Sequence, residues 1–332
     1  MQAFRGKNVY FSISEPYIEY LSIVDRLDSV NFPVERNLTV HNRREIKYSR
    51  RDGTKPSFFL VDSVRKVFGA KMTKRQTSDA AQRFDAYYAS IYADRWTALR
   101  AAMTEAHAQR EIGEPLLHPY YLDEASFFAA DILPAGQGDD VLDMCAAPGG
   151  KTLVLALKLQ GTGSLICNDR SATRRARLRT VIDEHLPASY RANIMVTGHD
   201  ASRWGLHEQQ AYDHVLLDAP CSSERHVIND HQALSQWSES RPKRLAIQQF
   251  AMLAAALEAV RIGGTILYST CSINPAENER VIEKLYDKRN GRFEELRTSV
   301  PYSEQRPCGA IVLPDTALGR GPLFFCLLRR LS

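Results

Sequence analysis

"DMCAAPGGKT" (residues 143–152) reads as the end of a strand, a tight turn and the start of a helix. Its tail, Gly149-Gly150-Lys151-Thr152, resembles the end of a phosphate-binding loop, but that loop needs a glycine where this chain has Cys145. The GxGxxG dinucleotide fingerprint is also absent. A turn of small residues still lets the backbone approach a ligand at a helix N-terminus. The stretch therefore predicts a binding turn that does not cradle a polyphosphate.

From about residue 115 onward, short apolar runs alternate with stretches of helical periodicity. We expect strands over 140–145, 164–169, 193–198, 213–219, 264–271 and 321–330, and helices over 150–160, 171–186, 243–261 and 276–289. Such alternation is typical of a parallel α/β sheet, which binds ligands outside the carboxyl ends of its strands. We therefore divide the chain into a mostly helical, basic N-terminal region (1–115) and an α/β domain (116–332).

The N-terminal region combines a basic block with an aromatic stripe. Residues 36–75 hold twelve Lys/Arg and three Asp/Glu, a formal charge of +9, whereas the whole chain carries +4. A basic block against a mildly acidic remainder favours a polyanionic partner such as nucleic acid. Residues 78–109 place Phe84, Tyr88 and Trp96 among apolar residues at helical spacing, which favours a buried helix face over a base-stacking surface.

Composition narrows the class of protein further. The chain has 332 residues, 44% of them hydrophobic, and no apolar run long enough to cross a membrane. Its six cysteines show no paired spacing, which favours a reducing compartment and gives no sign of a metal site. The first 14 residues lack a hydrophobic signal core and carry Arg5 and Lys7 without an acid, as transit peptides do, although Glu15 and Glu19 follow.

Three successive expected strands end in an aspartate. Asp169 lies about 20 residues after the glycine turn, where an acid commonly binds a ribose diol. Asp200 follows the next strand, where it can hold an adenine amino group, and Asp218 ends the one after. Because the glycine turn does not suit a polyphosphate, the adenosyl ligand that fits this pattern is S-adenosylmethionine.

Two cysteines lie just past strand ends. "LLDAPCSS" (216–223) places Cys221 after one strand, and "ILYSTCSINPAENE" (266–279) places Cys271 after another. Asn274, Pro275 and Glu277 read as the N-cap, first position and capping-box acid of a helix whose N-terminus would favour a thiolate at Cys271. The other four cysteines lie in apolar runs or a loop, where we expect small buried side chains: Cys145, Cys167, Cys308 and Cys326.

Five stretches in this order carry a resemblance: "DMCAAPGGKT", "NDRSATR", "GHDAS", "DAPCSS" and "YSTCSINPAENE". Over residues 115–332 the chain resembles the RsmB/Nop–Sun family of RNA cytosine-5 methyltransferases. The resemblance implies a Rossmann-like, class I S-adenosylmethionine-dependent methyltransferase sheet. The family usually has a glycine-containing stretch after Pro-Cys, whereas this chain has residues 222–226 (SSERH), which is similar to the branch that includes mitochondrial ribosomal-RNA enzymes.

The resemblance also implies roles for the two thiols. Cytosine C5 is a poor nucleophile, and addition of a thiolate at C6 makes it able to attack a methyl donor. The chemistry alone leaves the nucleophile open, because DNA cytosine-5 methyltransferases use the Pro-Cys position. The family pattern assigns Cys271 as the nucleophile and Cys221 to product release, with Asp218 and Lys151 beside the cytosine. It assigns the cofactor to Cys145, Ala146, Ala147, Pro148, Gly149, Gly150, Lys151, Asp169, Arg174, Asp200, Ala201 and Asp218.

Several alternatives remain open at this level. Ribosomal RNA is favoured over transfer RNA as substrate only by the branch resemblance. The motif order and the Thr-Cys after the fifth strand disfavour a DNA enzyme, and the intact thiols disfavour a ribosome-assembly factor that only binds RNA. A protein partner for targeting is compatible with the sequence, no membrane association is expected, and the compartment is the mitochondrial matrix or the cytoplasm.

Overall fold

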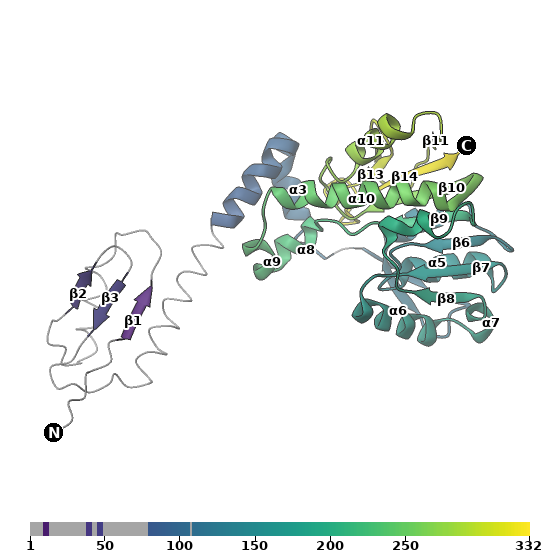
Figure 1. Ribbon diagram of the computed structural model, residues 1–332, viewed down its shortest axis with the longest axis horizontal. Helices are drawn as coiled ribbons and strands as arrows, with labels where there is room; N and C mark the ends of the chain where they lie inside the picture. Colours follow the sequence, from purple (N-terminus) through teal and green to yellow (C-terminus); the bar gives the residue numbers. More distant parts are fainter. Residues whose placement is uncertain (1–8, 13–37, 42–44, 49–78, 107) are drawn as a thin grey trace, which may run out of the picture. The chain divides into compact units, whose positions relative to one another are not determined.

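The computed structural model describes residues 9–12, 38–41, 45–48, 79–106 and 108–332 (Figure 1). The chain divides into two compact units, Met1–Thr73 and Lys74–Ser332. In the first unit, the strands β1 (Val9–Ser12), β2 (Leu38–His41) and β3 (Glu45–Tyr48) form an antiparallel sheet in the order β1-β3-β2. The expected mostly helical extension therefore does not describe these residues, whose β-branched Thr39, Val40 and Ile46 favour strands.

The second unit is built on a large mixed sheet. Its strand order is β12-β13-β14-β10-β9-β6-β7-β8, with β11 paired to β14. The strands are β6 (Asp140–Asp143), β7 (Ser164–Asn168), β8 (Ile194–Thr197), β9 (Tyr212–Asp218), β10 (Val260–Thr270), β11 (Phe293–Leu296), β12 (Ser303–Gln305), β13 (Ala310–Val312) and β14 (Leu323–Arg330). The pairs from β8 to β10 are parallel, and β14 is antiparallel to β10. The six strands expected from the sequence all form.

Helices cover both faces of this sheet (Figure 1). Besides the helix over residues 79–92, the helices of this unit are α3 (Trp96–Ala102), α4 (Glu124–Asp131), α5 (Gly150–Leu159), α6 (Ala172–His185), α7 (Ala188–Arg191), α8 (Glu224–Asn229), α9 (His231–Ser235), α10 (Ser240–Ala259) and α11 (Glu279–Arg289), with the short 3-10 turns η1 (Ala93–Arg95) and η2 (Ala201–Leu206). Within β9, Val215 and Leu217 join one core cluster and Leu216 joins the other. A strand buried on both faces needs no polar alternation, which explains the continuous apolar runs.

The helix over residues 79–92 belongs to the second unit. Phe84, Tyr88 and Trp96 are buried in the same cluster as Leu253 of α10 and Tyr268 of β10. The aromatic stripe is therefore core, as its helical spacing indicates. The compact unit consequently begins some forty residues before the boundary expected near 115, because this helix buries its apolar face against the sheet's covering helices.

The strand order places the candidate site. The chain runs outward from β6 to β7 and β8, then returns to the other side of β6 to form β9 and β10. The crevice for a ligand in an open α/β sheet lies at such a reversal, outside the carboxyl ends of the strands. The hairpin of β4 (Gln109–Ile112) and β5 (Tyr120–Asp123) forms a separate two-stranded sheet, and Leu122 of β5 packs beside the glycine turn at this edge.

Candidate active site

The two thiols singled out in the sequence meet at this edge. Cys221 follows β9 and Cys271 follows β10, and their sulfur atoms lie 3.0 Å apart. The Ser223 hydroxyl lies 3.2 Å from the Cys271 sulfur and 3.5 Å from that of Cys221. Cys271 is exposed and Cys221 is half-buried. Parallel pairing of β9 with β10 brings two residues together that are 50 positions apart in the chain.

The pair has one acidic and one weakly acidic thiol. A hydrogen bond from Cys221, helped by one from Ser223, lowers the pKa of Cys271. The same bond, together with burial, raises the pKa of Cys221 well above its usual range. The opposite directions of the two shifts favour a proton on Cys221 and a thiolate at Cys271. A thiolate is the reactive form of cysteine.

The cause of this activation differs from the one expected. Residues 275–278 form a turn, and α11 begins only at Glu279 with Asn278 at its N-cap position. Asn274 accepts a hydrogen bond from the Ala276 amide within that turn instead of capping the helix. The side chains of Cys221 and Ser223, and not a helix N-terminus, hold the negative charge of Cys271.

A lysine and an aspartate lie at the same edge. Lys151, in the first turn of α5, donates to Asp218 at the end of β9 over 2.8 Å. Ser269, the β10 residue opposite Asp218, donates to the other carboxylate oxygen over 2.9 Å. Burial alone would lower the pKa of Lys151, but the charge and hydrogen bond of Asp218 raise it. The lysine is thus a fixed cation and not a solvated surface residue.

The glycine turn packs too closely for side chains. Gly149 has φ of +122°, which L-residues rarely adopt, and a Cβ there would lie 3.0 Å from Val181 of α6. A Cβ on Gly150 would lie 2.7 Å from Leu122 of β5. The turn is therefore packed between α6 and the β4–β5 hairpin, where a side chain at either glycine would collide with a neighbour.

The acids on the other side of the turn are held by short local contacts. Asp169, only 4% exposed, accepts from the Ser171 amide and lies 2.9 Å from a guanidinium nitrogen of Arg174. Arg174 also donates to the Ala147 carbonyl, which joins the acid to the glycine turn. Asp200 caps η2 by accepting from the amide and hydroxyl of Ser202, and the hydroxyl bond chiefly lowers its pKa.

These residues fit an adenosyl ligand. The buried Oδ2 of Asp169 lies 2.9 Å from a guanidinium nitrogen of Arg174 but outside hydrogen-bond geometry, so it retains acceptor capacity for a ribose hydroxyl. Asp200 is held ionised at the neighbouring strand end, and Ala201 is buried behind it. The glycine turn beside them has Cys145 where a phosphate-binding loop needs glycine, so the donor set suits S-adenosylmethionine better than a nucleotide polyphosphate.

Some site residues were not singled out from the sequence. Asp143, at the end of β6, is buried and accepts from the Thr152 hydroxyl over 2.7 Å, and burial raises its pKa to about 7. Asn168 donates to the carbonyls of Met144 and His199 and so joins the ends of β6 and β8. Both residues lie at the ends of expected strands, and that position could have identified them as site residues from the sequence.

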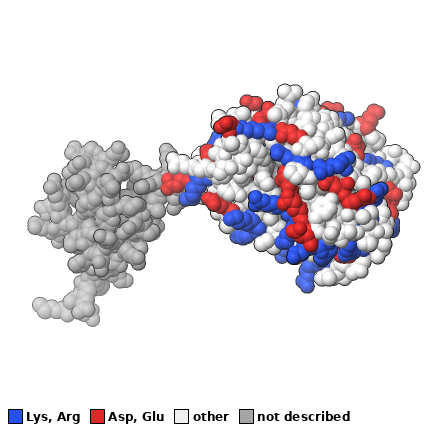
Figure 2. Space-filling view, turned by 90° about the horizontal axis from the view of Figure 1, so that it is seen from above, with Lys and Arg blue, Asp and Glu red and all other residues white. Residues whose placement is uncertain are grey.

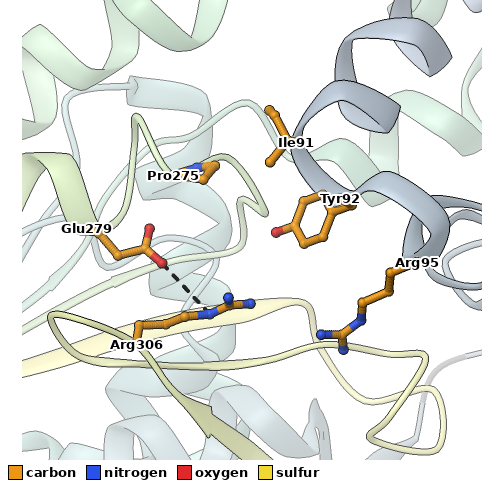
Figure 3. A pocket seen from close by; sticks show the side chains of 6 residues that line it. All are labelled: Ile91, Tyr92, Arg95, Pro275, Glu279 and Arg306. Atoms are coloured by element: carbon orange, nitrogen blue, oxygen red, sulfur yellow. Dashed lines mark ion pairs between the residues drawn. The ribbon is translucent and has the colours of Figure 1, made fainter.

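A crevice lies beside the loop that follows Cys271 (Figure 3). It has a volume of about 250 Å³ and is lined by Ile91, Tyr92, Arg95, Pro275, Glu279 and Arg306. Tyr92 donates to the Ile273 carbonyl over 2.6 Å and thus holds the loop from the side of the 79–92 helix. Glu279 pairs with Arg306, and Arg95 with Glu304, so the charges around this crevice are largely paired within the chain.

Two further observations concern the described residues as a whole. No group of three or more His, Cys, Asp or Glu side chains in the described ranges is arranged to hold a metal ion. In the same part of the chain, no helix combines the length and apolar composition needed to span a bilayer.

Solved structures share this fold. A methyltransferase homologue of Pyrococcus horikoshii aligns with a TM-score of 0.58 and 21% identity over 72% of this chain and 92% of its own. NSun6 of the same organism, solved with the ligand SFG, aligns with a TM-score of 0.54 and 26% identity over 64% of this chain and 53% of its own. Both alignments support the Rossmann-like, class I methyltransferase fold.

Within that class, residues 130–320 match the family described as 16S rRNA methyltransferase RsmB/F, and the chain belongs to this family. The 5-cytosine rRNA methyltransferase NSUN4 of Xenopus tropicalis is 33% identical over 65% of this chain and 57% of its own length. A mitochondrial tRNA (cytosine(34)-C(5))-methyltransferase of Danio rerio is 32% identical over 64% of this chain and 60% of its own. The chain thus spans less than two thirds of the curated relatives it matches.

Proposed function

We propose that this protein methylates C5 of cytosine in RNA, with ribosomal RNA as the favoured substrate, through a covalent bond between Cys271 and cytosine C6. The observation that carries the proposal is the pair of sulfur atoms 3.0 Å apart, beside the ion pair of Lys151 and Asp218, at the ligand edge of the sheet. Family membership and the names of the relatives support the same chemistry.

In the proposed mechanism, the Cys271 thiolate forms a bond to C6 and the electron pair of the C5–C6 double bond moves into the ring. Asp218 lies beside the thiols and stabilises positive charge on a protonated N3, while Lys151 offsets negative charge that develops on the base. Both groups are already fixed, by Ser269 and by one another, so little reorganisation is needed as charge develops.

Product release is the proposed task of Cys221. The C5 proton must leave and the Cys271–C6 bond must break, which regenerates the thiolate and the aromatic ring. In the free protein the raised pKa of Cys221 favours a proton on that thiol, whose sulfur lies 3.0 Å from that of Cys271. Once Cys271 is bonded to carbon, Cys221 would give its proton to solvent and, as a thiolate, accept the C5 proton, while the electron pair of the C6–S bond returns to Cys271.

The proposed cofactor contacts follow the same edge. S-adenosylmethionine supplies an electrophilic methyl group when it is bound. The turn over residues 145–151 would carry it, Asp169 would accept from the ribose, and Asp200 with Ala201 would hold the adenine. Arg174 is a positioning residue in this scheme, because it spans Asp169 and the Ala147 carbonyl.

The test is bisulfite sequencing of RNA treated with the purified full chain and S-adenosylmethionine. Ribosomal and transfer RNA are offered separately, because one relative carries the name of a ribosomal enzyme and another that of a transfer-RNA enzyme. The proposal predicts a discrete methylated cytosine in ribosomal RNA and none with Cys271→Ala. Methylation of transfer RNA alone would overturn the substrate, and the absence of methylation in both would overturn the activity.

We also propose that the basic N-terminal segment adds phosphate contacts. Residues 36–75 lie mostly outside the described residues, so the argument rests on their charge of +9. On the face of the second unit drawn in Figure 2, basic and acidic side chains are interspersed, and this face offers no extended single-sign surface.

A targeting partner is a further proposal. So is a reducing compartment, which a mitochondrial relative and six free thiols support.

A further inference from the structure

Two glutamates beneath the thiol loops have no part in the mechanism above. Glu224 follows Cys221 by three residues, and Glu277 follows Cys271 by six. Both are 0% exposed, and within the described residues neither carboxylate lies in an ion pair. A buried carboxylate without a cation is costly, so the structure must compensate for both.

Each glutamate binds the backbone of the other thiol's loop. Glu277, from the Cys271 loop, accepts from the Ser222 amide over 3.0 Å, and Ser222 directly follows Cys221. Glu224, from the Cys221 loop, accepts from the Ile273 amide over 3.0 Å, and Ile273 lies two residues after Cys271. The two bonds are reciprocal, so neither loop can move relative to the other without breaking one of them.

Shared hydroxyls link the two carboxylates to each other. The Ser272 hydroxyl lies 3.1 Å from an oxygen of Glu224 and 3.1 Å from one of Glu277. The Ser222 hydroxyl is also within hydrogen-bonding distance of both. A hydroxyl has a single proton and donates to one acceptor at a time, so the two hydroxyls cannot fill all four of these contacts at once, and a proton on one carboxyl group would fill a third. Two ionised carboxylates this close without a cation repel each other, and one proton shared between them would remove that repulsion.

The groups around the pair do not supply an alternative charge. Tyr88 donates to Glu224, and Gln249 donates to Glu277 over 2.9 Å. Tyr268 donates to the Glu277 carbonyl. The remaining titratable neighbours are Tyr92, Cys221 and Cys271. Burial, and then the charge of Glu224, raises the pKa of Glu277 to about 7.

We propose that Glu224 and Glu277 form a proton-sharing carboxyl clamp that positions the Cys221 and Cys271 sulfur atoms for reaction with the base. The catalytic purpose of the clamp rests on the proposed function, whereas its hydrogen bonds are present in the free protein. Its members are positioning residues, since they hold the thiol loops and contact neither sulfur. The departure from the family pattern at residues 222–226 supplies one half of it, Glu224.

The clamp has a defined pH dependence. Because the pKa of Glu277 in the folded state lies above its ordinary value, the shared proton stabilises the fold fully at acidic pH, and this contribution is lost as pH rises through about 7. Glu277→Gln replaces the shared proton with an amide hydrogen that can donate to Glu224 and keeps an acceptor for the Ser222 amide. That variant should hold the clamp at all pH values.

The first test measures the thiols without any methylation. The full chain is equilibrated with oxidised and reduced glutathione, so that two thiols and one glutathione disulfide give the Cys221–Cys271 disulfide and two glutathione thiols, and peptide mass mapping gives the equilibrium constant. We expect Glu277→Gln, and the exposed control Glu283→Gln, within about twofold of wild type, and Glu277→Ala at least tenfold lower. An unchanged constant in Glu277→Ala, or no disulfide in the wild type at any ratio, would overturn the clamp.

The second test decides the matter if Glu277→Ala does not fold. The free energy of unfolding is measured from pH 5 to 8 for the wild type, Glu277→Gln and Glu283→Gln. Asp143 also titrates near pH 7 and contributes equally to all three, so only the difference in slope is read. We expect the wild type and Glu283→Gln to lose stability more steeply than Glu277→Gln. Equal slopes would overturn the shared proton while leaving the proposed methylation untouched.

Discussion

The two halves of the ligand edge are held together in different ways. On the half formed by β7 and β8, Asp169 accepts from Ser171 and Asp200 accepts from Ser202, each two residues further along the chain. On the half formed by β9 and β10, the contacts that join the two thiol loops to each other and to the helix over 79–92 are long-range. Cys221 meets Cys271 across 50 residues, and Tyr88 reaches Glu224 across 136.

This difference separates binding from chemistry. Local turns after strands can form as soon as the strands do, and they offer fixed acids to a cofactor. The distance between two reacting sulfur atoms depends on two strands, on two loops and on the helix over residues 79–92, which contacts both loops. The binding half should therefore tolerate single changes with graded losses, whereas the thiol half should fail abruptly.

The largest expected effect comes from Cys271→Ala. Without the nucleophile, we expect methylation to fall by at least about 10⁴-fold and no covalent protein–RNA species to form. Incorporation of a radioactive methyl group and denaturing electrophoresis measure the two. The control is Cys308→Ala, which removes a buried thiol far along the chain, and it should keep normal turnover. Residual methylation above a hundredth of wild type would contradict the assigned nucleophile.

Cys221→Ala should fail at a later step. Addition and methyl transfer can proceed, but release stalls, so we expect a protein–RNA adduct that contains the transferred methyl group and turnover limited to about one event per molecule. Denaturing electrophoresis with labelled methyl groups detects it. If the adduct appears with Cys271→Ala and vanishes with Cys221→Ala, the two roles are reversed.

Replacement of Lys151 by methionine tests the fixed charge beside the thiols. Removing one preorganised electrostatic group typically costs about 10²–10³-fold in rate, and we expect a loss of that size in kcat. Lys288→Met, on the exposed side of α11, is the matched control. A loss confined to KM would place Lys151 in RNA binding and not beside the reacting base.

On the binding half, Asp169→Asn should weaken S-adenosylmethionine by about 10–100-fold, the size expected for a hydrogen bond to a charged group. Calorimetry on the free protein measures the affinity, and Asp287→Asn on the surface of α11 serves as the control. An affinity equal to wild type would mean that the Asp169 carboxylate pairs with Arg174 and does not bind the cofactor.

The smallest effect on turnover should come from the N-terminal segment. Replacing Arg43, Arg44, Arg50 and Arg51 by alanine should make the logarithmic salt dependence of RNA affinity shallower by up to about 3, because each phosphate contact releases a counterion. Cofactor affinity and turnover at saturating RNA should not change. An unaltered slope would show that these arginines do not contact phosphate.

The sequence predicted the sheet better than the site's supports. All six expected strands form within a few residues of their ranges, because buried parallel strands leave continuous apolar runs. The helix start at Asn274 was wrong: the turn there is held by Tyr268, Asn278 and Tyr92, whose contacts no local pattern reveals. The limit expected near residue 115 assigned the helix over 79–92 to the N-terminal region, whereas this helix packs in the core of the second unit, because membership of a core depends on what a helix packs against.

The sequence by itself determined the elements, the strand-end aspartates and the two thiols, because periodicity, turn chemistry and motif spacing are local properties of the chain. Only the tertiary structure decided that the thiols lie 3.0 Å apart, which of them is the more acidic, and that Glu224 and Glu277 hold each other's loops. Those features depend on the parallel register of β9 and β10 and on burial, and both arise only when residues far apart in the chain come together.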